Sequence, residues 1–396
     1  MNIAETYMHR CLELARLGAG HVAPNPMVGA VLVHKDRIIG EGWHRQYGQA
    51  HAEVNCIHSV KEEDLPLIQQ STLYVSLEPC AHFGKTPPCA DLIIVKKIPR
   101  VVIGCRDPFE EVNGKGIEKL RAAGVEVELG VLEKECIHLN RRFFTFNTLH
   151  RPYILLKWAQ SSDGKLAPED RSRVFISNEY TNRLVHRWRT EEASILVGTN
   201  TALYDDPALT ARLWKGPDPI RLVLDKDLRL PQSLRLFDRK VRTIIFNTVE
   251  QGEADGHWSG GRAGEGGSSG SAGGSSDGAD GSSGETGKTG GTDDDSRHAT
   301  LSWYKLTAGS SLIPQLVQAL YQLRIQSVLV EGGATLLQAF ISEGYWDEAR
   351  VITNEDLYIG EGLSAPVMNG PQLISREQFF SDTLCCYTNP AADART

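Results

Sequence analysis

Side chains that could bind a metal ion and use it in catalysis lie between residues 51 and 89. His51 is followed two residues later by Glu53, and cysteines stand at Cys80, directly after a proline, and at Cys89. A catalytic zinc site takes three nitrogen or sulfur ligands from the protein and keeps one position for water. Zinc lowers the pKa of that water to about 7, and an unligated acid can pass its proton to a leaving amino group. We therefore predict zinc on His51, Cys80 and Cys89, with Glu53 as the acid/base.

A second group of residues is suited to binding phosphate. The run from Val330 to Thr335 predicts a strand that passes through Gly332 and Gly333 into a helix. Free backbone N–H groups and the positive end of the helix dipole make such a junction a phosphate site. A tight turn between a strand and a helix has the same pattern. The Gly-x-Gly-x-x-Gly fingerprint of Rossmann proteins is absent after the first strand of this part. A phosphate site and a plain turn therefore both remain possible at 330–335.

The metal-binding residues fall among alternating strands and helices that cover about the first 145 residues. Apolar residues at helical spacing predict a helix at 5–17 that ends at Gly18, and another helix starts at His51 and runs to residue 60. The other predicted elements are strands at 27–33, 38–43, 71–77, 100–105 and 125–129 and helices at 89–97 and 116–123. Such alternation predicts a layered α/β domain, with Cys80 just after a strand.

A second alternating series follows Arg151-Pro152. Its predicted strands are 153–158, 195–198, 220–225, 241–246, 327–331 and 349–353, and its predicted helices are 179–189, 313–323 and 334–342. A segment at about 251–298, rich in glycine, serine and aspartate, interrupts it and is too poor in apolar residues to offset the entropy of ordering. We predict two domains, 1–146 and 151–396, and a disordered insert at 251–298 in the second.

Composition narrows the class of protein. Of the 396 residues, 41% are hydrophobic and 23% are charged, as in ordinary globular proteins. The net charge is −8, and residues 251–300, with nine acidic and three basic residues, account for −6 of it. Clustered Lys and Arg, which mark nucleic-acid-binding surfaces, are not found in the rest.

The location of the protein is predicted from similar signals. The chain does not start with a basic segment and an apolar core, and no apolar run reaches the roughly 18 residues of a membrane span. Eight thinly spread cysteines suit a reducing compartment. We expect a cytoplasmic enzyme with no nucleic-acid or membrane partner.

Several motifs together resemble a single enzyme family. They are Pro24-Asn25-Pro26-Met27-Val28-Gly29-Ala30, Gly42-Trp43-His44, Pro79-Cys80-Ala81-His82-Phe83-Gly84-Lys85-Thr86-Pro87-Pro88-Cys89, Arg106-Asp107-Pro108 and Asn113-Gly114-Lys115-Gly116, joined by 156–164, 197–201 and 205–212 in the second part. The chain thereby resembles the bifunctional riboflavin-biosynthesis enzymes, diaminohydroxyphosphoribosylaminopyrimidine deaminase / 5-amino-6-(5-phosphoribosylamino)uracil reductase. The resemblance implies an N-terminal cytidine-deaminase-like α/β/α domain and a C-terminal dihydrofolate-reductase-like α/β domain.

The resemblance implies two successive reactions. Zinc-dependent hydrolysis would deaminate 2,5-diamino-6-(5-phosphoribosylamino)pyrimidin-4-one, and NADPH would then reduce the ribosyl group of 5-amino-6-(5-phosphoribosylamino)uracil to ribityl. For the deaminase substrate, Asn25 and His44 are candidates to hold the pyrimidine ring, and His82 and Lys85 to bind the phosphate. Asn25 could instead only shape an Asn-Pro turn, and Lys85 could be a solvated loop lysine.

The resemblance also implies residues for the reductase half. Those expected at the cofactor are Ala159, Phe175, Thr201, Asp205, Gly333, Ala334, Thr335, Leu336 and Leu337. Those expected at the substrate are Arg189, Leu209, Arg212 and Glu331, with the arginines suited to its phosphate. Phe175 stands where the family usually has tryptophan, so an aromatic face is kept and the indole donor is lost. The stretch after Thr353 is assigned no role.

Two other functions fit part of the pattern. A nucleoside or RNA-base zinc deaminase with an unrelated tail would need only the metal residues, but it predicts a basic binding surface. A structural zinc scaffold without catalysis predicts four protein ligands around the ion. If Cys89 is not the third ligand, Cys56 and Cys105 are the next candidates. The sequence leaves the oligomeric state open, a homo-oligomer included.

Overall fold

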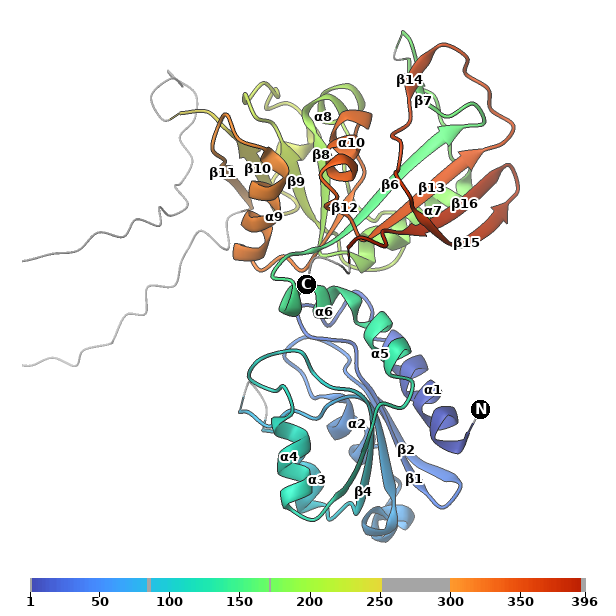
Figure 1. Cartoon of the computed structure of the whole chain (residues 1–396), viewed down its shortest axis with the longest axis vertical. Helices are drawn as coiled ribbons and strands as arrows, with labels where there is room; N and C mark the ends of the chain where they lie inside the picture. Colours follow the sequence, from blue (N-terminus) through green and yellow to red (C-terminus); the bar gives the residue numbers. More distant parts are fainter. Residues whose placement is uncertain (1, 84–86, 171, 251–299, 393–396) are drawn as a thin grey trace, which may run out of the picture.

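The structure is a computed structural model that describes residues 2–83, 87–170, 172–250 and 300–392. Lys85 and the predicted insert at 251–298 lie outside these described residues. Two units, each built on its own sheet, are stacked along the long axis of the molecule, with α6 (Arg141–Thr148) between them and α5 (Glu133–Leu139) leading to it from the N-terminal unit (Figure 1). We call them the N-terminal unit and the C-terminal unit.

The N-terminal unit has a five-stranded sheet in the order β2-β1-β3-β4-β5. Its strands are β1 (Gly29–His34), β2 (Arg37–Trp43), β3 (Thr72–Leu77), β4 (Arg100–Cys105) and β5 (Glu126–Leu129). β1 is antiparallel to β2 and β3, whereas β3, β4 and β5 are parallel. Its helices besides α5 and α6 are α1 (Ile3–Arg16), α2 (Ala52–His58), the 3-10 helix Glu62–Gln70, α3 (Cys89–Val95) and α4 (Lys115–Ala122).

Helices cover both faces of this sheet. One apolar cluster joins the sheet to α2, α3 and α4, and a second joins its other face to α1 and α5. Two glycines let the helices lie directly on the strands. A Cβ atom at Gly42 would stand 2.2 Å from the backbone nitrogen of Cys56 in α2, and one at Gly29 would stand 2.0 Å from the carbonyl oxygen of Cys11 in α1. Because any larger residue at Gly42 would push α2 away, this glycine holds the start of α2 next to the end of β2.

The C-terminal unit has a nine-stranded sheet in the order β11-β10-β9-β8-β12-β6-β13-β16-β15. Its strands are β6 (Tyr153–Ser161), β8 (Ser194–Gly198), β9 (Ile220–Leu224), β10 (Thr243–Asn247), β11 (Leu301–Lys305), β12 (Ser327–Val330), β13 (Glu348–Asn354), β15 (Gln372–Phe379) and β16 (Asp382–Thr388). β7 (Lys165–Pro168) and β14 (Gly362–Ser364) form a separate pair. The seven strands from β11 to β13 are parallel, and β16 and β15 are antiparallel additions.

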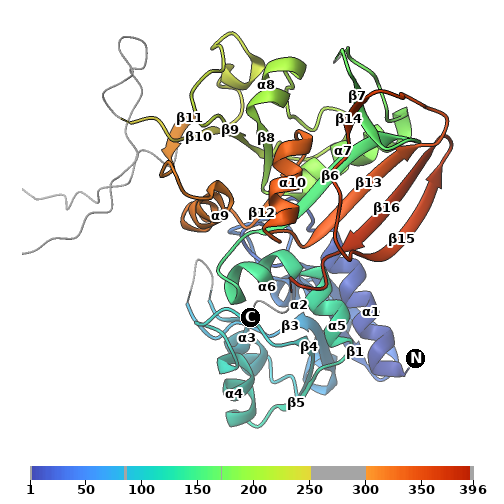
Figure 2. The same cartoon turned by 45° about the horizontal axis from the view of Figure 1, so that its top comes forward.

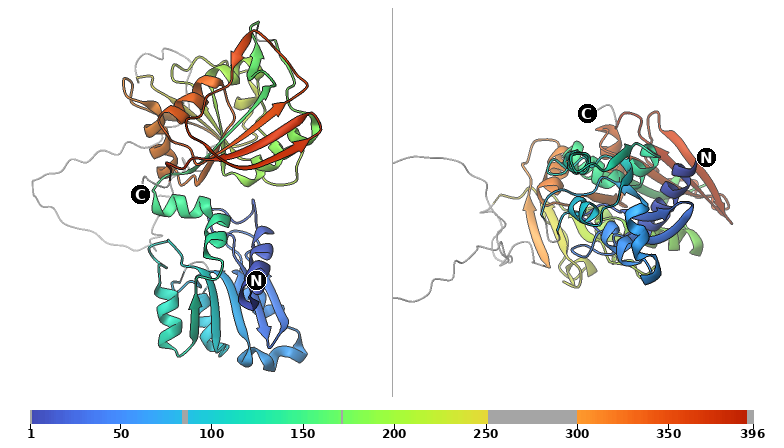
Figure 3. Two further views of the ribbon diagram at one scale, coloured as in Figure 1. Left: turned by 45° about the vertical axis from the view of Figure 1, so that its right-hand side comes forward. Right: turned by 90° about the horizontal axis from the view of Figure 1, so that it is seen from below.

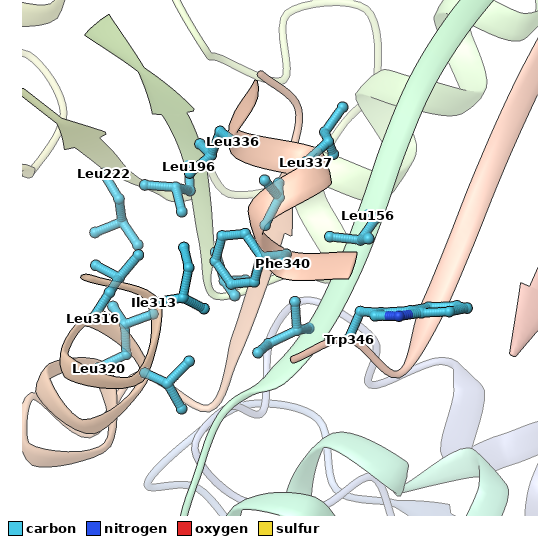
Figure 4. Close-up of a cluster of buried hydrophobic side chains, with 14 of the residues drawn as sticks. Leu156, Leu196, Leu222, Ile313, Leu316, Leu320, Leu336, Leu337, Phe340 and Trp346 are labelled. Carbon is cyan, nitrogen blue, oxygen red and sulfur yellow. The ribbon is translucent and has the colours of Figure 1, made fainter. Parts of the chain in front are cut away.

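Helices of the C-terminal unit lie on both sides of its sheet (Figures 2 and 3). They are α7 (Glu179–Glu191), α8 (Thr199–Asp205), the 3-10 helix Arg235–Phe237, α9 (Leu312–Gln322) and α10 (Ala334–Ser342). α9 and α10 pack on one face, where Phe340 lies between Leu196 of β8 and Leu156 of β6 (Figure 4). Val185 and Trp188 of α7 pack on the other face. Each unit therefore has its own core, as the alternating pattern predicted.

The predicted elements are present with ends shifted by a few residues, and several unpredicted ones are added. α5, α6, α8, β7, β11, β14 and the two 3-10 helices are among these. β15 and β16 fall in the stretch after Thr353, and they extend the sheet beyond β13. Most side chains of β15 are exposed, so this edge strand lacks the alternating apolar pattern by which a half-buried strand is recognised.

Polar contacts fix α6 and the first loop of the N-terminal unit to the C-terminal unit. Arg141 Nη2 lies 3.1 Å from Glu348 Oε2, and Arg142 forms an ion pair with the buried Glu192. Gln326 Nε2 donates to the carbonyl oxygen of Pro24 at 2.8 Å. Across the described ranges, no helix is long and apolar enough to cross a membrane.

Candidate functional site

The three predicted metal ligands converge at one end of the N-terminal sheet. His51 caps the start of α2, Cys80 follows β3, and Cys89 is the first residue of α3. His51 Nδ1 lies 3.6 Å from Cys80 Sγ and 3.4 Å from Cys89 Sγ, and all three ligand atoms lie within 4.8 Å of one another. Tetrahedral zinc with bonds of about 2.0 Å to nitrogen and 2.3 Å to sulfur holds such atoms about 3.5 Å apart. The donor set therefore fits zinc in both chemistry and spacing.

Glu53 lies beside these ligands in the first turn of α2 and lines the same cavity. Its side chain is buried, and burial raises the pKa of its carboxyl to about 7. A hydrogen bond from the Cys89 thiol, aided by His51, lowers the pKa of the Cys80 thiol to about 4. The cluster thus holds a thiolate suited to a metal and a carboxyl able to exchange a proton near neutral pH.

A cavity of about 520 Å³ opens from the ligands toward the C-terminal unit. Asn25 Nδ2 lies 3.3 Å from His44 Nε2, and the His44 ring stands edge-on to His51 with 5.3 Å between ring centroids. Both predicted ring-binding residues thus line the cavity next to the metal ligands. His82 also lines it, with its ring edge-on to Phe109. The volume is within the range of about 300–1,000 Å³ of small-molecule sites.

Glu78 is a residue of this site that the sequence analysis missed. It follows β3, and its buried carboxylate accepts backbone N–H bonds from Gly114 at 2.9 Å and Gly116 at 3.0 Å. These bonds fasten the loop before α4, which carries Asp107 and Phe109 into the cavity wall. Burial raises the pKa of Asp107 to about 7. The motifs around Asp107 and Gly114 were visible in the sequence, but the carboxylate that holds them was not.

In the C-terminal unit, predicted cofactor residues gather at the carboxyl ends of three neighbouring parallel strands. Ala159 is near the end of β6, Thr201 is in α8 just after β8, and Gly333 follows β12. A Cβ atom at Gly332 would stand 2.9 Å from Val197 Cα of β8, and one at Gly333 3.3 Å from Thr201 Oγ1. Glycines at these two positions let the loop after β12 run against the end of β8. The first turn of α10, with Ala334 and Thr335, begins directly after it.

The other predicted cofactor residues differ in how far their side chains are buried. Leu336 and Leu337 belong to the core cluster on which α10 packs (Figure 4), and the side chain of Leu336 also lies beside Gly198 at the end of β8. Asp205 ends α8, and burial raises the pKa of its carboxyl. Phe175 is 78% exposed, and the guanidinium of Arg173 lies 5.1 Å from its ring centroid.

The predicted substrate residues of this unit form a buried charged cluster. Arg189 of α7 pairs with Glu331 through Nη2 and Oε2 at 2.7 Å and donates to the carbonyl oxygen of Thr210 at 3.0 Å. Burial would raise the pKa of Glu331, but Arg189 lowers it to about 2. Arg212 is exposed near this cluster, whereas the side chain of Leu209 is buried in the core. Only the arginines and Glu331 therefore present polar side chains.

Two further groups of this cluster were not singled out by the sequence analysis. Lys157 of β6 lies near Glu331, and burial lowers the pKa of its ammonium group. His186 of α7 is buried, and burial together with Arg189 and Arg212 lowers its pKa to about 4. His186 falls one helical turn before Arg189, and this spacing was the available signal.

Known family profiles match both units. Residues 1–105 match the "Cytidine and deoxycytidylate deaminase zinc-binding region", and residues 152–257 and 289–374 match the "RibD C-terminal domain". The first match contains the three predicted metal ligands and Glu53, and the second contains the junction after β12.

Whole-length relatives carry both parts in one chain. "Riboflavin biosynthesis protein RibD" of Aquifex aeolicus is 37% identical over 364 residues, which cover 91% of this chain and 89% of that protein. The protein of the same name from Bacillus amyloliquefaciens is 36% identical over 95% of this chain and 89% of its own length. The crystal structure of a diaminohydroxyphosphoribosylaminopyrimidine deaminase/5-amino-6-(5-phosphoribosylamino)uracil reductase from Thermotoga maritima is similar with a TM-score of 0.79, 33% identity and 98% of each chain covered.

Proposed function

The chain belongs to the RibD family of bifunctional riboflavin-biosynthesis enzymes, and we propose the roles of its residues from that premise. It is a zinc-dependent deaminase and an NADPH-dependent reductase. We propose that residues 1–146 form the deaminase domain and residues 151–396 the reductase domain. The proposed substrates are 2,5-diamino-6-(5-phosphoribosylamino)pyrimidin-4-one and, after deamination, 5-amino-6-(5-phosphoribosylamino)uracil.

In the deaminase half, His51, Cys80 and Cys89 would hold zinc, which supplies a water of lowered pKa as the nucleophile. Glu53 takes one proton as the water adds to the carbon that carries the leaving amino group, and it returns a proton to that nitrogen so that ammonia departs. A carboxyl with a pKa near neutral pH suits both transfers. Asn25 and His44, 3.3 Å apart, orient the pyrimidine ring, and His82 and Lys85 bind toward its phosphate.

In the reductase half, NADPH would supply the hydride. The backbone groups of 333–337 and the side chains of Thr201 and Asp205 hold the cofactor at the ends of β8 and β12, and Ala159 and Phe175 complete its site. Arg189 and Arg212 attract the substrate phosphate, and Leu209 contacts the substrate through its backbone. Glu331, held ionised by Arg189, accepts hydrogen bonds from ribose hydroxyls.

The observation that carries this function is that one chain holds both a cluster of metal-binding side chains and a glycine junction after β12 that suits a phosphate group. A coupled assay tests it. The purified protein is given the diaminopyrimidine ribose phosphate and NADPH, and absorbance at the NADPH band is followed. We expect NADPH consumption that depends on prior deamination, and the deaminated substrate alone should support it. Deamination without any NADPH consumption would instead favour a deaminase with an unrelated tail.

We also propose small molecules, and neither nucleic acid nor membrane, as the ligands of the protein. Its net charge of −8 opposes polyanion binding. A cytoplasmic location is proposed because the described cysteines are free thiols and two of them are needed as metal ligands.

A further inference from the structure

The cavity above the predicted metal ligands is lined by residues from both units. Arg324 and Gln326 line it although they belong to the segment between α9 and β12 of the C-terminal unit. Gln326 Nε2 donates to the carbonyl oxygen of Pro24 at 2.8 Å, directly beside Asn25 of the opposite wall. The reductase half of the chain therefore builds part of the deaminase cavity, and this contact anchors the segment that carries Arg324.

Arg324 differs in charge from the other ionisable side chains that line the cavity. The lining carries the acids Glu53, Glu78 and Asp107, and Arg324 is its one lysine or arginine within the described ranges. A pyrimidine ribose phosphate brings about −1.5 to −2 charges at neutral pH. Such a group needs a cationic partner, and an arginine guanidinium can meet two phosphate oxygens at once.

Arg324 also differs from the other arginines at the junction of the two units. Arg141, Arg142 and Arg151 each pair with a carboxylate, namely Glu348, Glu192 and Asp347. Arg324 is exposed, and it has neither an ion pair nor a hydrogen bond from its side chain to any described residue. Its guanidinium is thus available to a ligand.

The backbone conformation at Arg324 decides which substitution tests its side chain. The residue follows the C-cap of α9 with φ of +59°, a left-handed conformation that glycine adopts without strain. Glycine at this position therefore keeps the backbone as it is and removes only the side chain. At this position, just after α9, Arg324 is among the residues that line the cavity.

We propose that Arg324 binds the phosphate of the deaminase substrate, so that the reductase half contributes a specificity-determining residue to the deaminase site. This rests on the proposed function. It adds to His82 a cation from a different unit, and it ties full affinity of the deaminase to the docking of the two units. Arg324 acts on binding and takes no part in the proton transfers at Glu53.

The test compares Arg324→Gly with Arg239→Gly in the full-length zinc-loaded protein. Arg239 is a matched control, because it is an exposed arginine of the same unit with φ of +58° and does not line the cavity. We expect Arg324→Gly to raise the deaminase KM for the phosphorylated substrate about tenfold with kcat nearly unchanged. Arg239→Gly should leave both constants at the wild-type values. Arg324→Gln removes the charge but introduces no glycine, so it should raise the KM to the same extent.

A second substrate separates charge recognition from packing. The matching riboside, which lacks the phosphate, should be deaminated by Arg324→Gly and wild type with equal KM. An unchanged KM for the phosphorylated substrate, or an equal rise with the riboside, overturns the proposal. Wild-type deamination in the same assay keeps this result distinct from the proposed function, which fails only if the wild-type protein itself does not deaminate.

Discussion

The metal site and the reductase site are built from different parts of the polypeptide. At the metal site, three side-chain atoms within 4.8 Å of one another come from a helix cap, a strand end and a helix start. At the reductase site, backbone junctions after three parallel strands meet, and the ion pair of Arg189 with Glu331 joins residues 142 positions apart. Metal ligands are rare side-chain types, whereas nucleotide sites use glycines and amides that every chain contains. The first kind of site therefore depends on a few side chains and the second on the whole sheet.

The carboxyl groups of the two sites also differ. Burial raises the pKa of Glu53 to about 7, whereas Arg189 lowers the pKa of Glu331 to about 2 despite its burial. One group is able to gain and lose a proton near neutral pH, and the other stays ionised. This contrast is what an acid/base and a binding group require, and the following experiments address it.

The largest effect is expected for Glu53→Gln. Glutamine keeps the shape of the side chain but cannot carry the proton, so the deaminase kcat should fall by roughly 10²–10⁴-fold. Zinc content by metal analysis and reduction of supplied deaminated substrate should stay at the wild-type level. Near-normal deamination by this variant would show that Glu53 is not the acid/base.

The next effect concerns the metal itself. Cys89→Ser removes one of three ligands, so zinc retained after dialysis should fall at least about tenfold and deamination should fall with it. Cys385→Ser, a change of the same kind in β16, is the control and should keep both. Because the units have separate cores, the reductase should survive in both variants. Full zinc content in Cys89→Ser would show that a residue other than Cys89 is the third ligand.

At the reductase site the expected effect is on stability as well as activity. Arg189→Gln leaves the carboxylate of Glu331 buried without its partner, since the two side chains are only 12% and 8% exposed. Loss of one partner of such a pair costs about 3–5 kcal/mol of unfolding free energy. Urea unfolding of the variant should show this cost, and the double variant with Glu331→Gln should recover much of it. If the losses of unfolding free energy in the two single variants simply add up in the double variant, the two residues are not coupled.

The same pair gives an acid dependence with a definite sign. Because the folded pKa of Glu331 is about 2, below its ordinary value of 4.5, its contribution to stability is present above about pH 4.5 and is lost as the pH falls toward 2. Glu331→Gln removes this group, so its unfolding free energy should fall less steeply over that range than that of the wild type. Equal slopes in the two proteins would contradict the lowered pKa.

The smallest effect is expected for the segment rich in glycine, serine and aspartate. It lies outside the described residues, between β10 and β11, which pair in parallel. Loop-closure entropy changes by only about 0.6 kcal/mol per doubling of length. Replacing residues 252–297 by a short Gly-Ser linker should therefore keep both activities and shift Tm by no more than a few degrees. A selective loss of reductase activity would show that the segment contributes to that site.

The sequence by itself predicted the candidate metal site and determined most of the sheet elements. His51, Cys80 and Cys89 could be found because zinc accepts few donor types and because a histidine at a helix start and a cysteine after a strand are visible as local patterns. Alternating strands and helices likewise predicted two layered units, since each element carries its own period of apolar residues.

Tertiary structure decided which distant groups meet. Leu336 and Leu337 turn into the core, Glu78 fastens the loop before α4, and Arg324 reaches the cavity of the other unit only because the two units dock. No local pattern contains these facts, because a side chain's partner is set by which strands lie side by side and which faces pack. The ligands of a metal can be recognised by their chemistry, but the walls of a cavity exist only once the chain is folded.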